Sequence, residues 1–202
     1  LKLNIMGLVV GFPVPVILAI MLNEIQSKGV KRVSQTLLYL PHFLSWIIIG
    51  GMMLKIFAPT TGVVNATLLK WGWIKENIPF LSDGPTWQWT YTLIGVWQNM
   101  GWGTILYLSA ITGINMELFE AAKIDGANKL QRIWHIDIPA LLPTIIILFI
   151  MNFGNLMSVG FEKAYALQTD LNMGASEIIS TYVYKKGLLD GDYGFSTAVG
   201  LF

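Results

Sequence analysis

The sequence predicts an all-α membrane protein, a bundle of helices that cross a lipid bilayer. Hydrophobic residues make up 54% of the 202 residues and charged residues only 12%, whereas soluble globular domains carry about 25% charged residues. The mean hydropathy is +0.58. The apolar residues form long runs, and about twenty apolar residues suffice for a helix to cross a hydrocarbon core roughly 30 Å thick. The bilayer is therefore the expected solvent of most of the chain.

The first two predicted spans are separated by a short basic segment. Residues 3–22 form an almost wholly apolar run, which Pro13 and Pro15 are expected to bend or interrupt. Residues 23–35 carry three cations and one acid. Because cytoplasmic loops are enriched in Lys and Arg, this loop is predicted to lie in the cytoplasm. A second span is predicted over residues 36–58.

The next connection and the third span are assigned to sides of the membrane by parity. Residues 59–87 are rich in proline and aromatic residues, and we expect them on the outer side. There Trp71, Trp73 and Trp87 would suit an interfacial aromatic belt. The third span is predicted over residues 89–111, after which the chain returns to the cytoplasmic side.

The rest of the chain is predicted to hold one full span and part of another. The fourth span, residues 139–159, begins with Pro139 at a helix start, where the missing N–H costs nothing. An outer loop over residues 160–192 follows, and a fifth span starts at Tyr193 and is cut off. We therefore expect a multi-span bundle with about five spans covered. Residues 1–202 are expected to form a single transmembrane domain, a fragment lacking the first span of the full protein and the end of the last.

A polar stretch between the third and fourth spans holds the most informative pattern. Met116, Phe119 and Ala122 are three residues apart, so they share one side of a predicted helix. Asp125-Gly126 supplies a turn that ends this helix. Apolar residues at helical spacing over residues 130–138 then predict a second, amphipathic helix. Such a helix lies on a surface or in a groove.

The pattern Glu120-Ala121-Ala122, Gly126, Ile136 and Pro139 resembles the EAA signature of permease subunits of bacterial ABC importers, and the resemblance covers essentially all of the chain. The one departure is Ile138, where the family usually has Leu, and the swap keeps an apolar branched side chain. The resemblance implies the fold of a type I ABC importer permease, in which this segment is the cytoplasmic coupling helix that docks into a groove of the ATPase subunit. An amphipathic helix that packs on its own protein is the alternative. The positions expected to couple to the ATPase are Phe119, Glu120, Ala121, Ala122, Asp125, Gly126, Ala127, Ile136 and Pro139.

Several functional classes are disfavoured by what the sequence lacks. There is no Gly-x-x-x-x-Gly-Lys-Ser/Thr motif to cradle a nucleotide phosphate. There is no Cys, and His42 and His135 fall in different predicted segments, so no histidine metal cluster is available. The net charge of +1 gives no basic excess for nucleic acid. We expect no catalytic residue, metal or cofactor in this chain, and the resemblance implies that ATP and Mg²⁺ are bound by partner ATPase subunits.

Amide side chains inside the predicted spans are the candidates for a substrate pathway. An unpartnered amide in hydrocarbon is costly, so such residues face other helices or a water-filled cavity. Amides and an aromatic ring together suit a sugar, but hydrogen bonding between helices explains the residues equally well. In maltose-type permeases of the family, side chains from the helices before and after the coupling helix contact the sugar. By this resemblance the expected pathway residues are Gln98, Asn99 and Trp102 in the third span and Asn152 and Asn155 in the fourth.

The resemblance implies the membrane-spanning subunit of an ATP-driven importer for an oligosaccharide or a polysaccharide fragment. The runs over residues 152–162 and 198–202 look like that branch of the family. Its members work with a second homologous permease subunit, two ATPase subunits and an extracytoplasmic substrate-binding protein, in the bacterial inner membrane as multi-pass proteins. The subunit itself is expected to hydrolyse nothing.

Three other classes of protein are alternatives to a sugar importer. An ion- or proton-coupled carrier uses acids inside its spans, and all twelve acids fall in predicted loops or at span ends. A membrane-embedded enzyme would need a paired acid and base within one span, and none is visible. ABC importers of amino acids and phosphate share the coupling motif, so a permease for a non-sugar solute stays an alternative.

Overall fold

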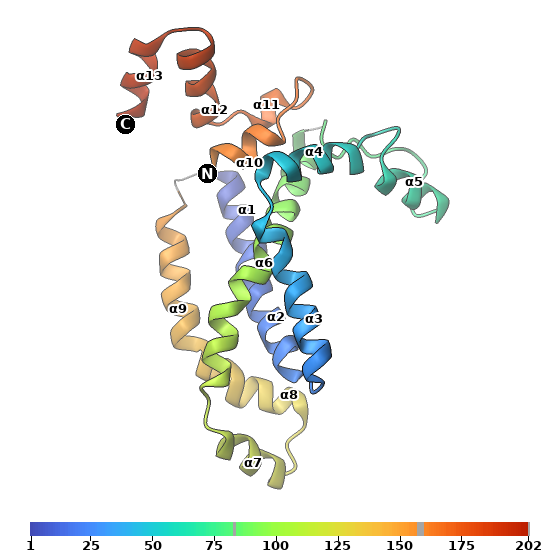
Figure 1. The fold of residues 1–202 in the computed structure, drawn as a ribbon, viewed down its shortest axis with the longest axis vertical. Coiled ribbons are helices and arrows are strands. Elements are labelled where there is room, and N and C mark those ends of the chain that lie inside the picture. The colour runs from blue at the N-terminus through green and yellow to red at the C-terminus, as the bar shows by residue number, and fades with distance from the viewer. Residues whose placement is uncertain (83, 157–159, 202) are drawn as a thin grey trace. The chain divides into compact units, whose positions relative to one another are not determined.

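The structure, a computed structural model, describes residues 1–82, 84–156 and 160–201. Within these ranges it consists of helices joined by turns, without a strand (Figure 1). This confirms the predicted all-α fold class. Contacts divide the chain into two compact units. The first unit comprises Lys2–Phe43 and Gly95–Met157, and the second unit comprises Leu44–Ile94 and Ser158–Phe202 together with Leu1.

The first unit holds most of the long apolar helices. One long helix, α6 (Gly84–Thr112), contributes residues to both units, and those from Gly95 onward belong to the first. The other elements of this unit are α1 (Lys2–Gly11), α2 (Pro13–Glu24), α3 (Lys28–Tyr39), η1 (Leu40–Phe43), α7 (Met116–Ile124), α8 (Lys129–Arg132), η2 (Ile133–Asp137) and α9 (Ile138–Gly154).

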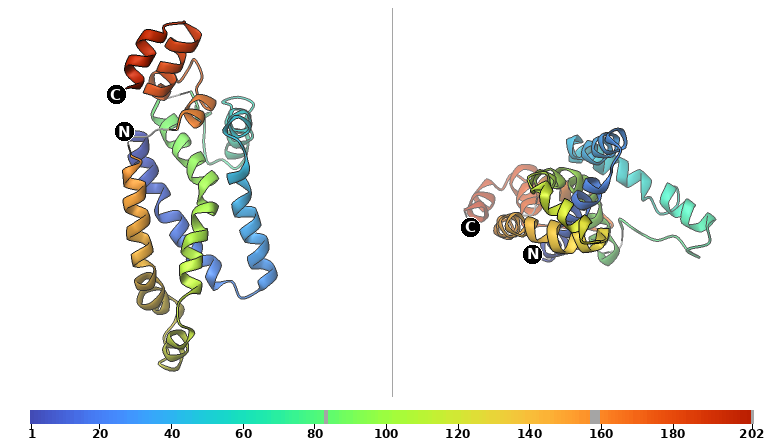
Figure 2. Two further views of the ribbon diagram at one scale, coloured as in Figure 1. Left: turned by 60° about the vertical axis from the view of Figure 1, so that its left-hand side comes forward. Right: turned by 90° about the horizontal axis from the view of Figure 1, so that it is seen from below.

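A buried apolar cluster joins α2, α6 and α9, whose lower parts lie side by side in the views of Figures 1 and 2. The helices approach closely where α6 carries glycine. A Cβ atom on Gly101 would collide with the backbone of Leu38 in α3, and one on Gly103 would lie 2.8 Å from Cγ of Pro15 in α2. Small residues therefore set the spacing of these helices, as is common between membrane helices. The cluster consists of Ala19, Leu22, Tyr107, Leu108, Ile111 and Leu141.

The second unit is built from shorter helices around a buried tryptophan. The indole Nε1 of Trp87 donates a hydrogen bond to the carbonyl oxygen of Leu167 (3.2 Å), and the amide of Asn172 donates to the carbonyl oxygen of Leu81 (2.6 Å). The first bond ties the backbone at Leu167 to the first turn of α6, and the second ties Asn172 to the loop that precedes α6. Its elements besides α6 are α4 (Trp46–Ile56), α5 (Val63–Lys70), α10 (Phe161–Ala166), α11 (Met173–Ser176), α12 (Ile179–Tyr184), η3 (Lys185–Leu189) and α13 (Tyr193–Gly200).

Among the described residues, two helical segments are long and apolar enough to cross a membrane. They are Lys2–Glu24 and Lys129–Gly154, and a third arises if Lys28–Phe43 and Trp46–Ile56 are counted as one broken span. The 29-residue helix α6 is long enough, but its amide, hydroxyl and glycine residues lower its hydropathy. The predicted fifth span is represented by the eight residues of α13 and stays a prediction. The predicted end of the fourth span, at residue 159, lies outside the described residues.

The structure corrects the second predicted span and the loop before it. The loop over residues 23–35 is shorter than predicted, because α3 begins at Lys28 with Ser27 as its N-cap. The span over residues 36–58 is not one helix. It is interrupted by the turn η1, and α4 starts anew at the N-cap Ser45, whose hydroxyl accepts a hydrogen bond from the backbone N–H of Ile48 (3.4 Å).

The two predicted outer loops, residues 59–87 and 160–192, are also more ordered than expected. The first contains α5, and the second contains α10, α11, α12 and η3. Trp87 does not belong to an interfacial belt, because it lies in α6 and is fully buried. Trp71 and Trp73 are exposed, and their ring centroids lie 5.2 Å apart.

Candidate coupling helix and substrate pathway

The helix α7 is capped at both ends by its own sequence. The side chain of Asn115 accepts a hydrogen bond from the backbone N–H of Glu117 (3.0 Å). At the other end Gly126 has a φ of +77°. The N–H of Ala127 donates to the carbonyl of Ala122 (2.9 Å), and that of Gly126 donates to the carbonyl of Lys123 (3.2 Å). This is a Schellman motif, which satisfies the last carbonyls of the helix and needs a residue without a Cβ penalty. The predicted glycine turn is confirmed.

The second predicted helix of the motif is continuous with the fourth span. Asn128 and Gln131 form a capping box at the start of α8, with hydrogen bonds of 2.9 and 2.8 Å. The π-helical turn η2 follows, and Pro139 sits in the first turn of α9 as predicted. Because η2 carries one widened turn, it interrupts the regular hydrogen-bond ladder between α8 and α9.

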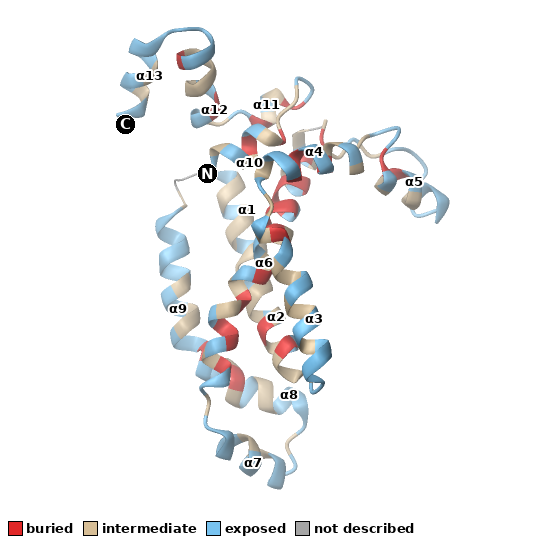
Figure 3. Ribbon diagram, in the orientation of Figure 1, coloured by how far each residue is buried: buried red, intermediate tan, exposed pale blue. Residues whose placement is uncertain are grey.

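Most of α7 is exposed (Figure 3). Several of its apolar side chains are exposed as well: Met116 is 67%, Leu118 53% and Ile124 87% exposed. Exposed apolar groups gathered on a short helix are typical of surfaces that contact another protein or a membrane. Of the predicted coupling positions, Glu120, Ala121, Asp125, Gly126 and Pro139 are exposed, and Phe119, Ala122, Ala127 and Ile136 are partly buried.

An ionic cluster ties α8 to the end of α2. The carboxylate of Glu24 lies 3.5 Å from the ammonium of Lys129 and 3.6 Å from the guanidinium of Arg132. The buried carboxyl group of Asp137 is attracted by Arg132 and repelled by Glu24. Ion pairs thus connect α8, which carries part of the motif, to α2 in the first span.

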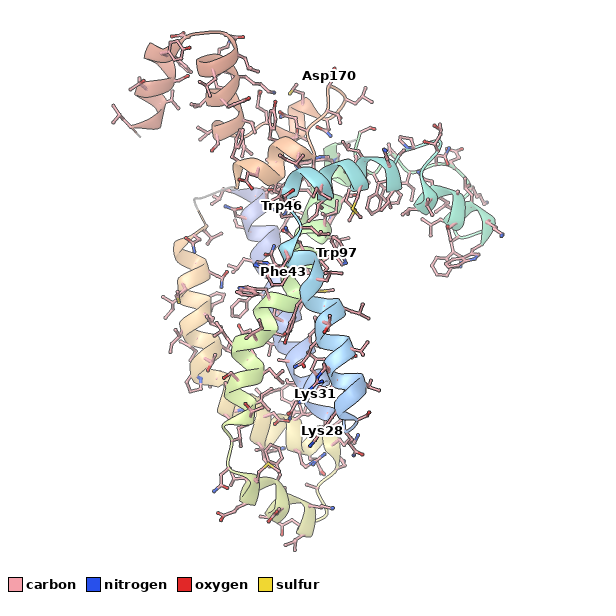
Figure 4. All side chains as sticks on the ribbon, viewed as in Figure 1. Lys28, Lys31, Phe43, Trp46, Trp97 and Asp170 are labelled. Carbon is pink, nitrogen blue, oxygen red and sulfur yellow. The ribbon has the colours of Figure 1, made fainter. Side chains whose placement is uncertain are left out.

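Cations gather at the end of the first unit where the motif lies. Lys28 and Lys31 stand on the first turn of α3, at the same end of this unit as α8 (Figure 4). Lys129 and Arg132 belong to α8. This distribution agrees with the predicted cytoplasmic side, because Lys and Arg accumulate there.

The predicted pathway residues of the third span contact two aromatic residues that the sequence did not point to, His42 and Phe43. The ring of His42 stacks on Trp102 with centroids 4.6 Å apart and planes 8° apart, and its Nδ1 lies 3.2 Å from Oδ1 of Asn99. Phe43 meets the same indole edge to face at 6.1 Å, and the amide of Asn99 donates to Oε1 of Gln98 (3.3 Å). The sequence signal that could have indicated a special site is a His beside a proline inside an apolar run, Pro41-His42.

The cluster of His42, Phe43, Gln98, Asn99 and Trp102, here called the aromatic–amide cluster, is accessible. Trp102 is 49% exposed and Phe43 72% exposed. The two amides predicted in the fourth span lie elsewhere. Asn152 and Asn155 are exposed and donate to carbonyl oxygens of their own helix, at 2.8 and 3.2 Å. The structure therefore brings the third-span residues together and gives no contact between them and these two.

Comparison with known proteins assigns the chain to a family. Residues 11–185 match the model of the binding-protein-dependent transport system inner membrane component. The chain is 41% identical over its full length to Protein LplB of Bacillus subtilis (strain 168), covering 63% of that protein. It is 40% identical to the polygalacturonan/rhamnogalacturonan transport system permease protein YteP of the same organism, covering all of this chain and 62% of that protein.

A solved structure agrees with the fold. The chain superposes with a TM-score of 0.89 and 38% identity on a chain of a bacterial ABC transporter involved in the import of the acidic polysaccharide alginate, covering 100% of this chain and 70% of that one. The same transporter has been solved in complex with an alginate pentasaccharide-bound periplasmic protein. The fold is that of a helical membrane transport subunit. The chain belongs to the family of binding-protein-dependent transport system inner membrane components, and it spans a little over three fifths of the length of the two curated relatives.

Proposed function

We propose that this chain is part of the membrane-spanning subunit of an ATP-driven ABC importer for oligosaccharides or polysaccharide fragments. Residues 1–202 would form one permease domain in a bacterial cytoplasmic membrane, with ATP and Mg²⁺ bound by two separate ATPase subunits. A second permease subunit and an extracytoplasmic substrate-binding protein would complete the assembly. The observation that carries this proposal is α7, a capped helix that leaves its apolar side chains uncovered.

The coupling role follows from the mechanics of α7. A nine-residue helix is marginal by itself, because isolated helices shorter than about 12 residues are barely stable in water. The caps at both ends stabilise this short helix, so that α7 would move as a rigid unit when a partner binds it. Met116 and Ile124 lie on adjoining sides of α7, and burying them in a groove of the ATPase subunit would remove exposed apolar surface from water. Movement of α7 would then pass through the Gly126 turn to α8. From α8 it would reach α2 through the ion pairs of Glu24, and α9 through the continuous backbone.

The sugar pathway rests on the aromatic–amide cluster. Amides can donate to and accept from hydroxyl groups, and an indole face can cover the apolar face of a pyranose ring. The relatives named for polygalacturonan, rhamnogalacturonan and alginate support a sugar chain as the transported solute. In the described structure His42 covers one face of Trp102, so a sugar would bind the exposed part of the indole or displace the imidazole.

Replacing Trp102 by Ala is expected to raise the half-saturating sugar concentration for uptake about tenfold. The lost contact with an aromatic face is worth on the order of 1.4 kcal/mol, which corresponds to a factor of ten. Leu106→Ala is the matched control, because Leu106 lies one turn further along α6 and is 56% exposed. Uptake kinetics of the complete importer provide the measurement, and equal kinetics for Trp102→Ala and wild type would remove Trp102 from the pathway.

The function itself is tested by uptake into membrane vesicles that carry the whole assembly. We expect radiolabelled oligosaccharide to accumulate when ATP is supplied on the ATPase side, and not when the ATPase subunits are omitted. Accumulation without them, driven by an ion gradient, would contradict the proposal and favour a secondary carrier.

A further inference from the structure

Lys163 occupies an unusual position in the second unit. Its ammonium lies 3.6 Å from the centroid of the Tyr91 ring and 5.5 Å from that of Trp46. Trp46 stands at the start of α4, next to α10, which carries Lys163 (Figure 4). The lysine therefore sits between α10, α4 and α6, with aromatic rings around a cation and part of its surface open to solvent.

The packing of α10 fixes this position. Ala164 and Leu167 are fully buried, and Leu167 receives the hydrogen bond from the Trp87 indole. Ala166 lies three residues after Lys163, on the same side of α10. Its backbone approaches α4 so closely that a Cβ atom on Gly50 would lie 2.6 Å from the carbonyl oxygen of Ala166. The ammonium is thus held in place rather than swinging freely on the surface.

No ion pair joins Lys163 to a carboxylate within residues 1–82, 84–156 and 160–201. Among the described residues, the ion pairs join other lysines, such as Lys185 with Glu177 (3.3 Å) and Lys186 with Asp190 (2.7 Å). Burial lowers the pKa of Lys163 to about 7, because the charged form loses hydration. The cation–π contacts with Tyr91 and Trp46 offset part of the free energy lost with that hydration. A partly buried cation without a counter-ion is costly to keep, and an incoming anion would compensate it.

We propose that Lys163, with Tyr91 and Trp46, recognises a carboxylate group on the transported sugar chain. This inference rests on the proposed function and names its substrate class as oligosaccharides that contain uronic acid. Rings next to an ammonium suit such a sugar, since a pyranose can lie against the rings while its carboxylate meets the cation. The names of relatives that handle acidic or galacturonan polysaccharides agree with this chemistry.

The proposal predicts a pH dependence with a definite sign. Below pH 7 the ammonium is charged and binds a uronate, whose own pKa lies well below this range, and above pH 7 the charge is lost. Affinity for the acidic sugar is therefore expected to fall as the pH rises from 6 to 8. Other ionisable side chains on the elements around Lys163 are Lys55 on α4, Tyr91 on α6, Glu162 and Tyr165 on α10, and Tyr182 and Tyr184 on α12, and of these Tyr91 contacts the ammonium.

The test compares two probes with the same sugar chain, one with free carboxylates and one with uncharged methyl esters. Cells with the complete importer are given trigalacturonate or its fully methyl-esterified form, and uptake is measured for wild type, Lys163→Met and Lys163→Arg. Lys70→Met, which removes an exposed lysine at the end of α5, is the control. A charge-assisted contact is worth about ten- to hundredfold in affinity. We expect Lys163→Met to lose that much for the acid and little for the ester, with Arg restoring most of the loss and abolishing the pH dependence.

The outcomes separate this inference from the proposed function. Unchanged preference for the acid in Lys163→Met would overturn it, as would an equal loss for acid and ester, which would indicate a structural role or a protein contact. Wild-type uptake of the ester but not the acid would overturn it and leave the importer proposal standing. ATP-dependent uptake of neither probe would count against the proposed function as well as this inference.

Discussion

Replacing Gly126 by Val is expected to reduce ATP-driven uptake at least tenfold while the protein still inserts into the membrane. Gly126 has a φ of +77°, and a left-handed conformation costs an L-residue about 1 to 2 kcal/mol, most of all a β-branched one. Val would move the backbone out of this conformation and break the two hydrogen bonds that close α7. The helix would then meet the ATPase subunit at the wrong angle. Uptake and membrane content are measured side by side.

Gly126→Asn is the matched variant, because Asn tolerates the left-handed region better than other residues with a side chain. We expect it to keep most of the uptake, and to preserve stimulation of ATP hydrolysis by the loaded binding protein. If Val and Asn behaved alike and both transported at the wild-type rate, the geometry of this turn would have no part in coupling.

Replacing Gly101 by Ala is expected to destabilise the first unit by about 1 to 3 kcal/mol, the usual cost of inserting a methyl group into a packed interior. A Cβ atom there would collide with the carbonyl carbon and oxygen of Leu38. Because those are backbone atoms of α3, a side-chain rotation cannot make room. The melting temperature of the purified complex is expected to fall by several degrees.

Gly7→Ala controls for the change of residue type. Gly7 lies inside α1, and a Cβ atom there meets nothing within 4 Å. Ala is the better helix former by about 1 kcal/mol, so this variant is expected to be as stable as wild type or more so. A melting temperature for Gly101→Ala equal to that of Gly7→Ala would show that α3 and α6 do not pack as described.

Features that depend on local sequence were predictable. The end of α7 follows from Gly126, and the start of α9 follows from Pro139, because turn and cap chemistry is decided within a few residues. The first span, which ends before Glu24, was likewise predictable, because a long apolar run is recognised from composition alone. The coupling assignments are a prediction by resemblance, and the structure adds that α7, which carries Phe119, Glu120, Ala121 and Ala122, is largely exposed and capped.

Features that depend on distant contacts were missed. Residues 36–58 read as one apolar span, since the hydroxyl cap at Ser45 is a weak signal inside a hydrophobic run. Helices in the outer segments are held by bonds such as that from Asn65 to the carbonyl of Ile78 (2.9 Å), which no periodicity reveals. His42 and Trp102 are 60 residues apart in sequence, so their stacking follows only from the packing of η1 against α6.

The most direct test of the account asks on which side of the membrane α7 lies and what it contacts. Residues 1–202 contain no cysteine, so Ile124→Cys and Trp73→Cys provide single reactive sites on exposed side chains. In intact cells, a membrane-impermeant maleimide is expected to label position 73 and not position 124. A thiol-directed photocross-linker at position 124 is expected to join the chain to the ATPase subunit. Labelling of position 124 from outside, or its failure to cross-link to an ATPase subunit in the purified complex, would contradict the account.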